Sequence, residues 1–276
     1  MNKYNEIIKA YKNGYAIPQF NTINAEYTRY ILEECEKEKS PVILGVSEKV
    51  AKHLGGFKVA KNIVDGLIED LNITIPVILH LDHAKSKEAC EKAIKAGFDS
   101  IMIDYSSYTL EENIKITKSL VEENPNTIIE CEVGTIGKNG NEGIIYSNLE
   151  DIEKIKRETN AHLIAPSFGT VHGIYKGEPR LNFNLLKEIK NKIDTPLVMH
   201  GGSGLSDENF KESISNGIAK ININTELKQA WTKSIREFLK NNPTETDPVY
   251  ITESVSEELK KVVSKLIKIF GSNNRI

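Results

Sequence analysis

Short runs rich in isoleucine, valine and leucine alternate along this chain with amphipathic stretches of helical length. This alternation is typical of repeated β/α units around a parallel sheet. Eight such runs are present, and they predict strands at 16–21, 41–46, 76–81, 100–104, 127–133, 162–165, 196–200 and 218–222. Helices are expected between them at 26–37, 87–96, 111–123, 149–158, 185–192 and 208–215.

Two folds contain this alternation, the (β/α)8 barrel and the doubly wound sheet. Polar residues stand where the predicted strands end: Asp82 with His83, Asp104, Glu132, His200 and Asn222. In a barrel those ends converge on one mouth, where catalytic groups lie, and a barrel needs roughly 250 residues. We therefore predict an α/β fold, a single TIM-barrel domain over residues 1–276. An additional C-terminal helix at 254–269 is expected to pack against the barrel or a second subunit.

Composition and charge limit the kinds of partner that we expect this chain to bind. The net charge is -3, and no basic stripe with interleaved aromatic residues occurs, so we expect no nucleic-acid binding. No run of 18 apolar residues and no signal-like N-terminal segment is present, so no membrane association is expected. Cys35, Cys90 and Cys131 lack CxxC spacing, as is usual where thiols stay reduced, and a cytoplasmic location is predicted.

Three of the six histidines fall at strand ends or beside glycine: His83, His172 and His200. Histidines from three different β/α loops can hold zinc and leave one coordination position open for a substrate oxygen. The alternative is that each satisfies a local hydrogen bond, which is the usual role of a lone histidine. Structural roles are expected for the other three, His53, His80 and His162.

Carboxylates accompany these histidines. Neighbouring residues on a strand point to opposite faces, so Asp82 and His83 cannot both reach one metal without a turn. Asp82 is therefore interpreted as a proton carrier, with orientation of a ligand histidine as the alternative. Glu130 and Glu132 share one face of their strand. Glu132 and Asp104 suit either a second cation site or a hydrogen-bonded network.

Glycine-rich segments indicate a phosphate site. His200 to Gly204 reads HGGSG after the seventh strand, and Asn222 to Thr225 reads NINT at the end of the eighth. Backbone N–H groups in the loops after these two strands form the recurrent phosphate site of TIM barrels. Lys176 is either an added positive charge for the phosphate or a solvated loop lysine.

Six segments carry a family resemblance: HLDHA, SIMIDYS, ECEVGTIG, APSFGTVHGIYKGEPRLNF, LVMHGGSGL and AKININTEL. In this order and spacing they resemble the class II fructose-bisphosphate and tagatose-bisphosphate aldolases of the short-chain subgroup. The resemblance runs from about Pro18 to Trp231. It implies a glycolytic lyase that reversibly cleaves fructose 1,6-bisphosphate into dihydroxyacetone phosphate and glyceraldehyde 3-phosphate through a zinc-stabilised enediolate.

The resemblance also assigns residues. It implies that His83, His172 and His200 bind the catalytic Zn2+, with Asp82 as the acid/base. Asp104 and Glu132 match acidic positions near the metal. The implied contacts with dihydroxyacetone phosphate are Gly173, Gly201, Ser203, Asn222 and Thr225, with Asn24, Ser47 and Lys176 as further contacts. A monovalent cation, Na+ or K+, is implied near the phosphate.

Three residues bear on specificity. Asn224 lies on the same side of the barrel mouth as Asn222, and relatives that cleave fructose bisphosphate carry Asp or Asn there, whereas tagatose-cleaving ones tend to carry Ala. Lys228 is expected to bind the second phosphate, unless a neighbouring subunit of a homodimer or homotetramer does so. The loop at 134–143 carries only Glu142 where relatives carry acidic residues, and whether Glu142 assists proton transfer stays open.

Other functions stay open on the sequence alone. A tagatose-bisphosphate or other ketose-phosphate aldolase shares the same chemistry. A zinc hydrolase on the same barrel leaves the two phosphate loops unexplained. A non-catalytic metal-binding barrel conflicts with the presence of all six segments.

Overall fold

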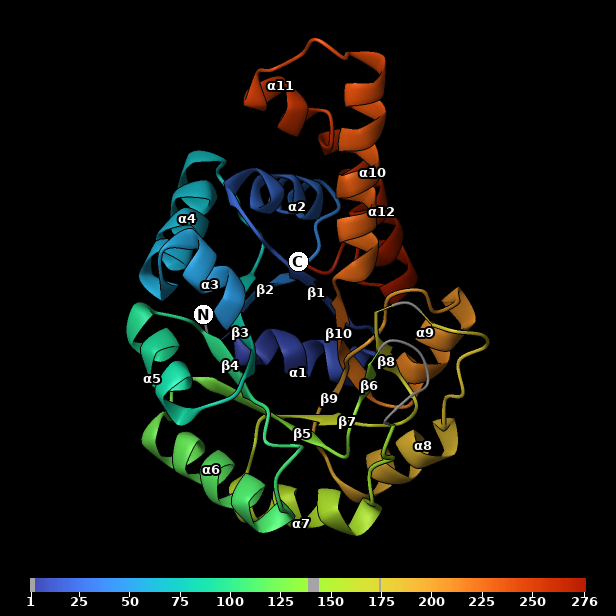
Figure 1. Cartoon of the computed structure of the whole chain (residues 1–276). Helices are drawn as coiled ribbons and strands as arrows, with labels where there is room; N and C mark the ends of the chain where they lie inside the picture. The colour runs from blue at the N-terminus through green and yellow to red at the C-terminus, as the bar shows by residue number, and fades with distance from the viewer. Residues whose placement is uncertain (1–2, 139–143, 174) are drawn as a thin grey trace.

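The computed structural model describes residues 3–138, 144–173 and 175–276. Eight parallel strands close into a barrel in the order β1-β10-β9-β7-β5-β4-β3-β2, with helices around it (Figure 1). The predicted (β/α)8 fold is thereby confirmed. The barrel strands are β1 (Ile17–Asn21), β2 (Val42–Ser47), β3 (Val77–Ala84), β4 (Ser100–Ile103), β5 (Ile128–Val133), β7 (Leu163–Pro166), β9 (Leu197–Met199) and β10 (Ile218–Ile223). Two short strands, β6 (Gly137–Lys138) and β8 (Val171–His172), pair with each other outside the barrel.

The helices begin where local sequence signals place them. Serine, threonine or asparagine side chains cap seven of the described helices by accepting an N–H of the first turn, among them Ser86 before α5 and Thr109 before α6. The surrounding helices are α2 (Ala25–Lys37), α3 (Glu48–Leu54), α4 (Phe57–Asp70), α5 (Lys87–Ala96), α6 (Leu110–Glu123), α7 (Leu149–Thr159), α8 (Phe183–Lys192), α9 (Asp207–Ser215) and α10 (Thr225–Asn241). Predicted and observed bounds differ by only a few residues.

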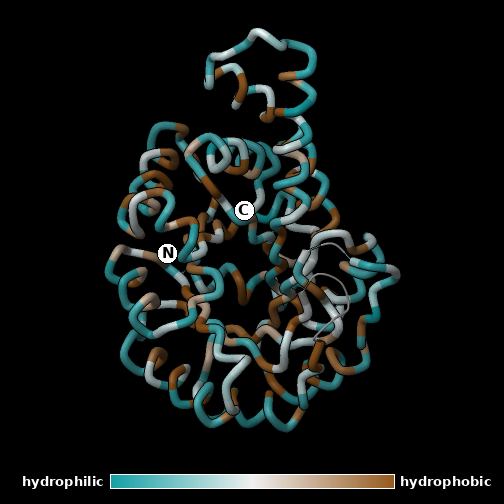
Figure 2. Tube along the Cα trace, viewed as in Figure 1, coloured by the Kyte–Doolittle hydropathy of each residue, from teal (hydrophilic) through white to brown (hydrophobic). Residues whose placement is uncertain are grey.

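The barrel interior is layered, because alternate residues of each strand point inward. An apolar layer that includes Ile17, Ile43 and Ile78 lies at the amino end of the strands, where Ile7 and Ala10 of α1 (Tyr4–Asn13) pack on it. A fully buried polar layer follows, with Gln19, His80, Glu130 and Lys220. The next inward positions, at the carboxyl ends, form the mouth. Hydropathy along the chain shows the apolar residues gathered on the inner faces of the helices and in the strands (Figure 2).

The C-terminal helix α12 (Ser256–Phe270) packs on the barrel of its own chain. It buries Leu259, Val263, Leu266, Ile267 and Phe270 and lies against α2, α9 and α10. Of the two alternatives for this helix, the structure therefore shows the contact with the barrel. The outer part of α10 and the short helix α11 (Pro248–Glu253) project beyond the ring of helices (Figure 1).

Two smaller expectations are also settled. Cys35, Cys90 and Cys131 are all buried and free, as expected. In the part of the chain that the structure describes, no helix is both long and apolar enough to span a membrane.

Candidate metal centre and active site

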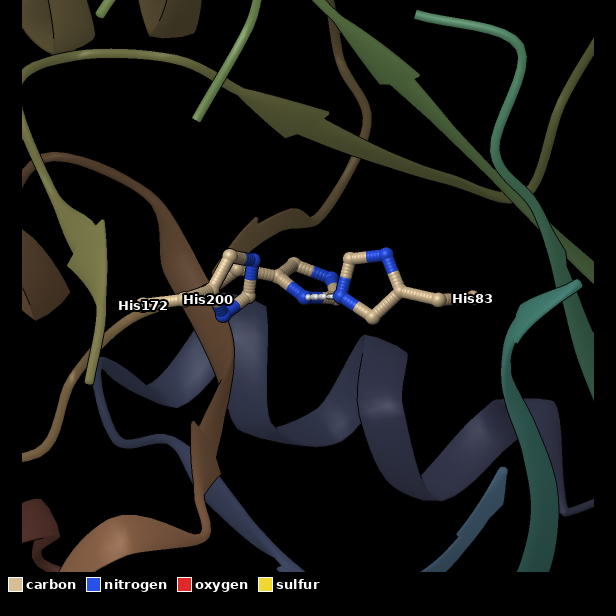
Figure 3. Close-up of side chains that lie close together, drawn as sticks. All are labelled: His83, His172 and His200. Carbon is tan, nitrogen blue, oxygen red and sulfur yellow. Dashed lines mark hydrogen bonds between the residues drawn. The ribbon is translucent and has the colours of Figure 1, made fainter. Parts of the chain in front are cut away.

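Three imidazole rings meet at the mouth of the barrel (Figure 3). His83 comes from β3, His172 from β8, and His200 directly follows β9. Their ring centroids are 4.5 to 5.8 Å apart, and one nitrogen of each lies within 4.8 Å of the others. His83 Nε2 and His200 Nδ1 are separated by 2.9 Å. Three imidazole nitrogens that face one point match the donor set of a catalytic zinc site.

A kink in β3 places His83 at this point. His83 has φ of 55°, the left-handed region, and the pairing of β3 with β4 shifts register between Leu81 and Ala84. The sequence predicted that β3 ends at residue 81, but the strand continues to Ala84. The left-handed residue supplies the turn that adjacent strand residues otherwise lack, so Asp82 and His83 both reach the mouth.

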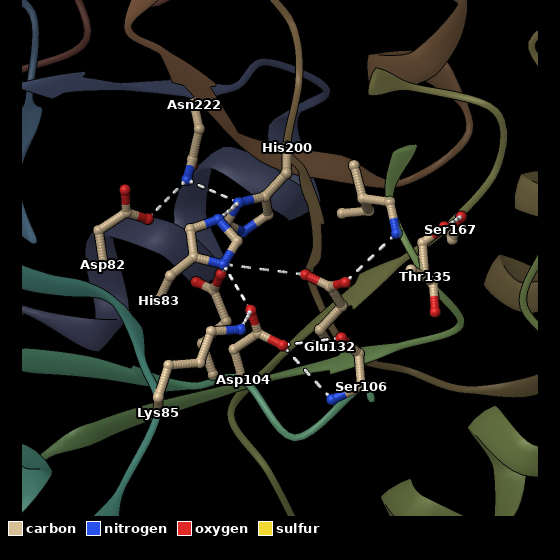
Figure 4. A network of polar contacts seen from close by, with 12 residues as sticks. Asp82, His83, Lys85, Asp104, Ser106, Glu132, Thr135, Ser167, His200 and Asn222 are labelled. Carbon is tan, nitrogen blue, oxygen red and sulfur yellow. Dashed lines mark hydrogen bonds and ion pairs between the residues drawn. The ribbon is translucent and has the colours of Figure 1, made fainter. Parts of the chain in front are cut away.

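Hydrogen bonds orient two of the three rings, and Figure 4 shows the one between His83 and Asp104. His83 Nδ1 lies 3.0 Å from Asp104 Oδ2, and His200 Nε2 lies 2.8 Å from Glu130 Oε1. The opposite nitrogens of these rings are therefore the ones directed at the cluster. Burial and the charges of His83 and His200 lower the pKa of His172 to about 3, so its ring is neutral. Burial also lowers the pKa of His200. Neutral imidazole is the form that binds metal.

His83 differs from its two neighbours. Burial lowers its pKa, but the charge of Asp82 and the hydrogen bond to Asp104 outweigh burial and raise the pKa to about 9. The site without metal therefore prefers a cation at this position. A metal ion would replace that proton and meet the same surrounding negative charge.

Asp82 is held by two amides. Asn21 Nδ2 donates to Asp82 Oδ2 at 2.7 Å, and Asn222 Nδ2 donates to Asp82 Oδ1 at 3.3 Å. Burial raises the pKa of Asp82, but the charges of His83 and His200 hold it well below its ordinary value. The carboxylate is thus ionised and fixed beside the histidines. Sequence reasoning missed Asn21, although its position two residues after the inward-facing Gln19 was a usable signal.

Asp104 and Glu132 form a polar network next to His83. Besides His83, Asp104 contacts the ammonium group of Lys85 and accepts the hydroxyl of Ser106 at 2.7 Å. Burial and the charge of Asp104 raise the pKa of Glu132 to about 7. His83, Asp104 and Glu132 also bring ligand atoms within 4.8 Å of one another. Both sequence alternatives, a hydrogen-bonded network and a second cation site, are compatible with this arrangement.

The glycine-rich loops adjoin the histidine cluster. Gly173, Gly201, Ser203, Asn222, Asn224 and Thr225 line one cavity together with Asp82 and the three histidines. Gly201 has φ of 66°, and a Cβ atom there would lie 2.4 Å from the carbonyl oxygen of Val171, so only glycine fits. Ser203 Oγ accepts the Thr225 N–H at 3.2 Å, where α10 begins. A helix N-terminus with a close glycine loop suits an anion.

Two amide oxygens in this cavity lack partners. The Oδ1 atoms of Asn222 and Asn224 are buried, and neither has a hydrogen-bond partner among the described residues. A buried unpaired carbonyl oxygen is costly, so a ligand that donates a hydroxyl there would be favoured.

Other predicted site residues do not line this cavity. Asn24 caps α2 by accepting the Tyr27 N–H at 2.9 Å, and Ser47 caps α3 by accepting the Val50 N–H at 3.3 Å. Lys176 is exposed. Lys228 lines a separate groove along α10 that shares Thr225 with the cavity. Glu142 and part of the 134–143 loop lie outside the described residues.

The chain's sequence was compared with a family model and with known proteins, and these comparisons agree with one another. The family model "Fructose-bisphosphate aldolase class-II" matches residues 2–275. The fructose-bisphosphate aldolase of Geobacillus stearothermophilus is 44% identical over 273 residues, covering 97% of this chain and 95% of that protein. The fructose-bisphosphate aldolase of Staphylococcus aureus strain N315 is 43% identical over 275 residues, covering 98% and 96%.

Solved structures agree over nearly the whole chain. The YdjI aldolase from Escherichia coli K12 superposes with a TM-score of 0.86 at 30% identity, covering 99% of this chain and 97% of that one. A putative fructose-1,6-bisphosphate aldolase from Coccidioides immitis gives a TM-score of 0.88 at 26% identity, covering 98% and 96%.

Proposed function

Because this chain belongs to the class II fructose-bisphosphate aldolase family, we propose that the cluster at the barrel mouth is its active site. The enzyme is a carbon–carbon lyase that reversibly cleaves fructose 1,6-bisphosphate into dihydroxyacetone phosphate and glyceraldehyde 3-phosphate, a step of glycolysis. One observation carries the assignment of the site: three imidazole nitrogens converge beside the buried carboxylate of Asp82.

The three histidines would hold the zinc ion on which class II aldolases depend. His83 would bind through Nε2 and His200 through Nδ1, since Asp104 and Glu130 occupy their other nitrogens. Bound zinc supplies a Lewis acid that polarises the ketone and stabilises the negative charge left when the carbon–carbon bond breaks. Three protein ligands leave a position for substrate oxygen, as in other catalytic zinc sites.

Asp82 would move the proton of the reacting hydroxyl. In the cleavage direction its ionised carboxylate accepts the proton from the hydroxyl that becomes the aldehyde, and in the reverse direction it returns that proton. Asn21 and Asn222 hold the carboxylate through hydrogen bonds of 2.7 and 3.3 Å. A general base must lie within hydrogen-bond distance of the proton that it accepts, so a carboxylate held in a fixed position suits this role.

The phosphate groups would bind on either side of this centre. Gly173, Gly201, Ser203, Asn222 and Thr225 line the cavity and would bind the dihydroxyacetone phosphate half. Lys228 is proposed for the second phosphate: burial and the nearby charge of Lys49 lower its pKa, and two close ammonium groups favour an anion. Only the family resemblance supports further substrate contacts by Asn24, Ser47 and Lys176. The same resemblance alone supports a Na+ or K+ ion near the phosphate.

We also propose that residues 1–276 form one domain and that the chain works in the cytoplasm as a homodimer or homotetramer. The domain proposal is supported by α12, which packs on the barrel. Three free, buried cysteines support the cytoplasmic location. The projecting segment of α10 and α11 exposes Leu239, Val249 and Tyr250, which supports contact with a second copy.

A metal-removal assay tests this function. Cleavage of fructose 1,6-bisphosphate should stop after chelation and return when Zn2+ is added back. Replacement of His83, His172 or His200 by Ala should abolish stoichiometric zinc binding, because three ligands leave no redundancy. His162→Ala, at a histidine remote from the mouth, is the control and should keep its zinc. Full turnover in protein shown to be metal-free by elemental analysis would contradict the proposal.

A further inference from the structure

A buried polar layer lies directly beneath the proposed metal site. Gln19, His80, Glu130 and Lys220 are each 1% exposed or less. The interior layers of a TIM barrel are usually filled by branched apolar side chains. A buried lysine and carboxylate cost desolvation energy that apolar residues would avoid. The proposed proton transfer and phosphate binding use none of these four side chains, so their presence calls for a separate explanation.

For each hydrogen bond in this layer, the donor and the acceptor can be assigned. Ser100 Oγ donates to the carbonyl oxygen of Ile128 at 3.1 Å, so it accepts from His80 Nδ1, which lies 2.8 Å away. His80 therefore carries its hydrogen on Nδ1, and its Nε2 is an acceptor for Lys220 Nζ at 3.4 Å. Lys220 Nζ also donates to Glu130 Oε2 at 2.6 Å. The ammonium group thus has its acceptors on β3 and β5.

The same order of donors and acceptors continues through Glu130 to His200 at the proposed metal centre. One carboxylate oxygen is taken by Lys220, and the other lies 2.8 Å from His200 Nε2. An ionised carboxylate only accepts, so His200 must donate from Nε2. Its Nδ1 lone pair then faces the cluster, 2.9 Å from His83 Nε2 and 3.2 Å from Asn222 Nδ2.

We propose that Glu130, fixed by Lys220, is a positioning residue that holds the ring and tautomer of His200 so that Nδ1 faces the metal. The inference rests on the proposed function, because it assigns His200 as a zinc ligand. Partners of this kind behind a metal-binding histidine set its orientation and its strength as a ligand. Glu130 does not touch the substrate in this view and acts only through His200.

The competing explanation is that the buried pair serves folding alone. A double variant distinguishes the two explanations. Removal of one partner of a buried ion pair leaves an unpaired charge and destabilises strongly, whereas replacement of both partners costs much less. Fold stability should therefore recover in the double variant. Positioning of His200 should not recover, since the carboxylate acceptor is still missing.

The experiment compares the parent with four variants: Glu130→Gln, Lys220→Met, the double Glu130→Gln/Lys220→Met, and Cys131→Ala. Three quantities are measured for each protein. Zinc affinity comes from competition with a chelator, the ligand field from the visible absorption of the Co2+-substituted protein, and stability from urea unfolding of the metal-free protein. Cys131 is the matched control, because it neighbours Glu130 on β5 but packs in the outer core.

Glu130→Gln should weaken zinc binding about 10- to 100-fold and change the Co2+ spectrum. Lys220→Met should lower the metal-free unfolding midpoint the most. The double variant should regain much of that stability yet keep the weak affinity and altered spectrum of Glu130→Gln. Cys131→Ala should lose stability while its zinc affinity and Co2+ spectrum stay those of the parent.

Two results would overturn the inference. One is a Glu130→Gln variant with the parent's zinc affinity and Co2+ spectrum. The other is zinc affinity that simply follows stability across the set, falling in Cys131→Ala and recovering in the double variant. A parent chain that binds no zinc would contradict the proposed function itself, and this inference with it; none of the five proteins would then bind zinc, whatever their stabilities.

Discussion

His83 shows how much chemistry depends on the backbone of one residue. A non-glycine residue at φ of 55° is uncommon and costs on the order of 1 to 3 kcal/mol unless the surroundings enforce it. Here the residue lies at the register shift between β3 and β4. The strained turn lets two consecutive residues, a carboxylate and an imidazole of the proposed metal site, face the same cavity. The strain is thus located at the proposed active site.

The role of Asp82 can be separated from metal binding. Asp82→Ala should lower kcat by about 10²- to 10⁴-fold, the range typical for loss of a general acid/base. Zinc content should stay normal, because the three proposed imidazole ligands are intact. Steady-state kinetics and elemental analysis on the same sample provide the measurement. A variant that loses its zinc would instead make Asp82 a ligand or an orienting group.

Asn224 is expected to set the choice between epimers. Its Oδ1 is buried without a hydrogen-bond partner among the described residues, in the cavity that holds Asp82. It can accept the C4 hydroxyl in one configuration and lose that bond with the epimer, a difference of about 1 to 3 kcal/mol. The enzyme should therefore prefer fructose 1,6-bisphosphate over tagatose 1,6-bisphosphate, and Asn224→Ala should reduce the ratio of kcat/KM values. An unchanged ratio, or a parent that prefers tagatose bisphosphate, argues against this role.

At the scale of elements, α2 is tied to the segment that leads into β3. Glu36, near the end of α2, accepts the backbone N–H groups of Thr74 at 2.7 Å and Ile75 at 3.1 Å. It also accepts the Thr74 hydroxyl at 2.8 Å. This contact fixes the start of β3, the strand whose other end carries Asp82 and His83.

The pKa of Glu36 makes this contact dependent on pH. Burial raises the pKa, but hydrogen bonds from Lys39, Thr74 and Ile75 outweigh burial and lower it from 4.5 to about 2. The folded-state pKa is below the unfolded one, so the ionised carboxylate stabilises the fold above pH 4.5. That stabilisation is lost as the pH falls from 4.5 through about 2.

Glu36→Gln should therefore reduce the free energy of unfolding by about 1 to 3 kcal/mol at pH 7 and by clearly less at pH 3. Urea unfolding of the metal-free protein at both pH values measures the difference. Glu91→Gln is the control, since the i,i+4 pair that Glu91 forms with Lys87 at 3.8 Å is exposed and its loss should change little. An equal cost for Glu36→Gln at both pH values would contradict the reasoning.

At the scale of the whole molecule, the projecting segment of α10 and α11 is the part least explained by a single barrel. Val249 and Tyr250 are each 58% exposed there. Exposure of such apolar side chains to water is unfavourable, and a second copy of the chain that packs on the projection would remove that exposure.

Val249→Glu should shift the assembly toward a smaller species, because a charge at the centre of an apolar contact stays unpaired. Sedimentation velocity at micromolar concentration measures the mass, and circular dichroism should show an unchanged fold. Val59→Glu is the matched control, since Val59 is also an exposed valine but lies on α4. If both variants keep the parent's mass, or if the parent is already a monomer, this contact is not the interface.

The sequence by itself determined the order of the β/α units and most of their bounds, because hydrophobic period and helix caps are local properties. It also carried the identity of the family, since the motifs stand in one order and spacing. It did not predict helix α1, which has no strand before it, nor the extension of β3 to Ala84, which follows from the unusual φ of His83.

The tertiary structure decided which side chains meet. Asn21 reaches Asp82 across 61 residues of sequence, and Lys220 reaches Glu130 across 90. Asn24, three residues from Asn21, caps α2 instead. These pairings depend on the register between strands that close the barrel, and a shift of one residue would turn each side chain to the opposite face. No local pattern contains that register, so the contacts around the proposed zinc site became visible only once the barrel was closed.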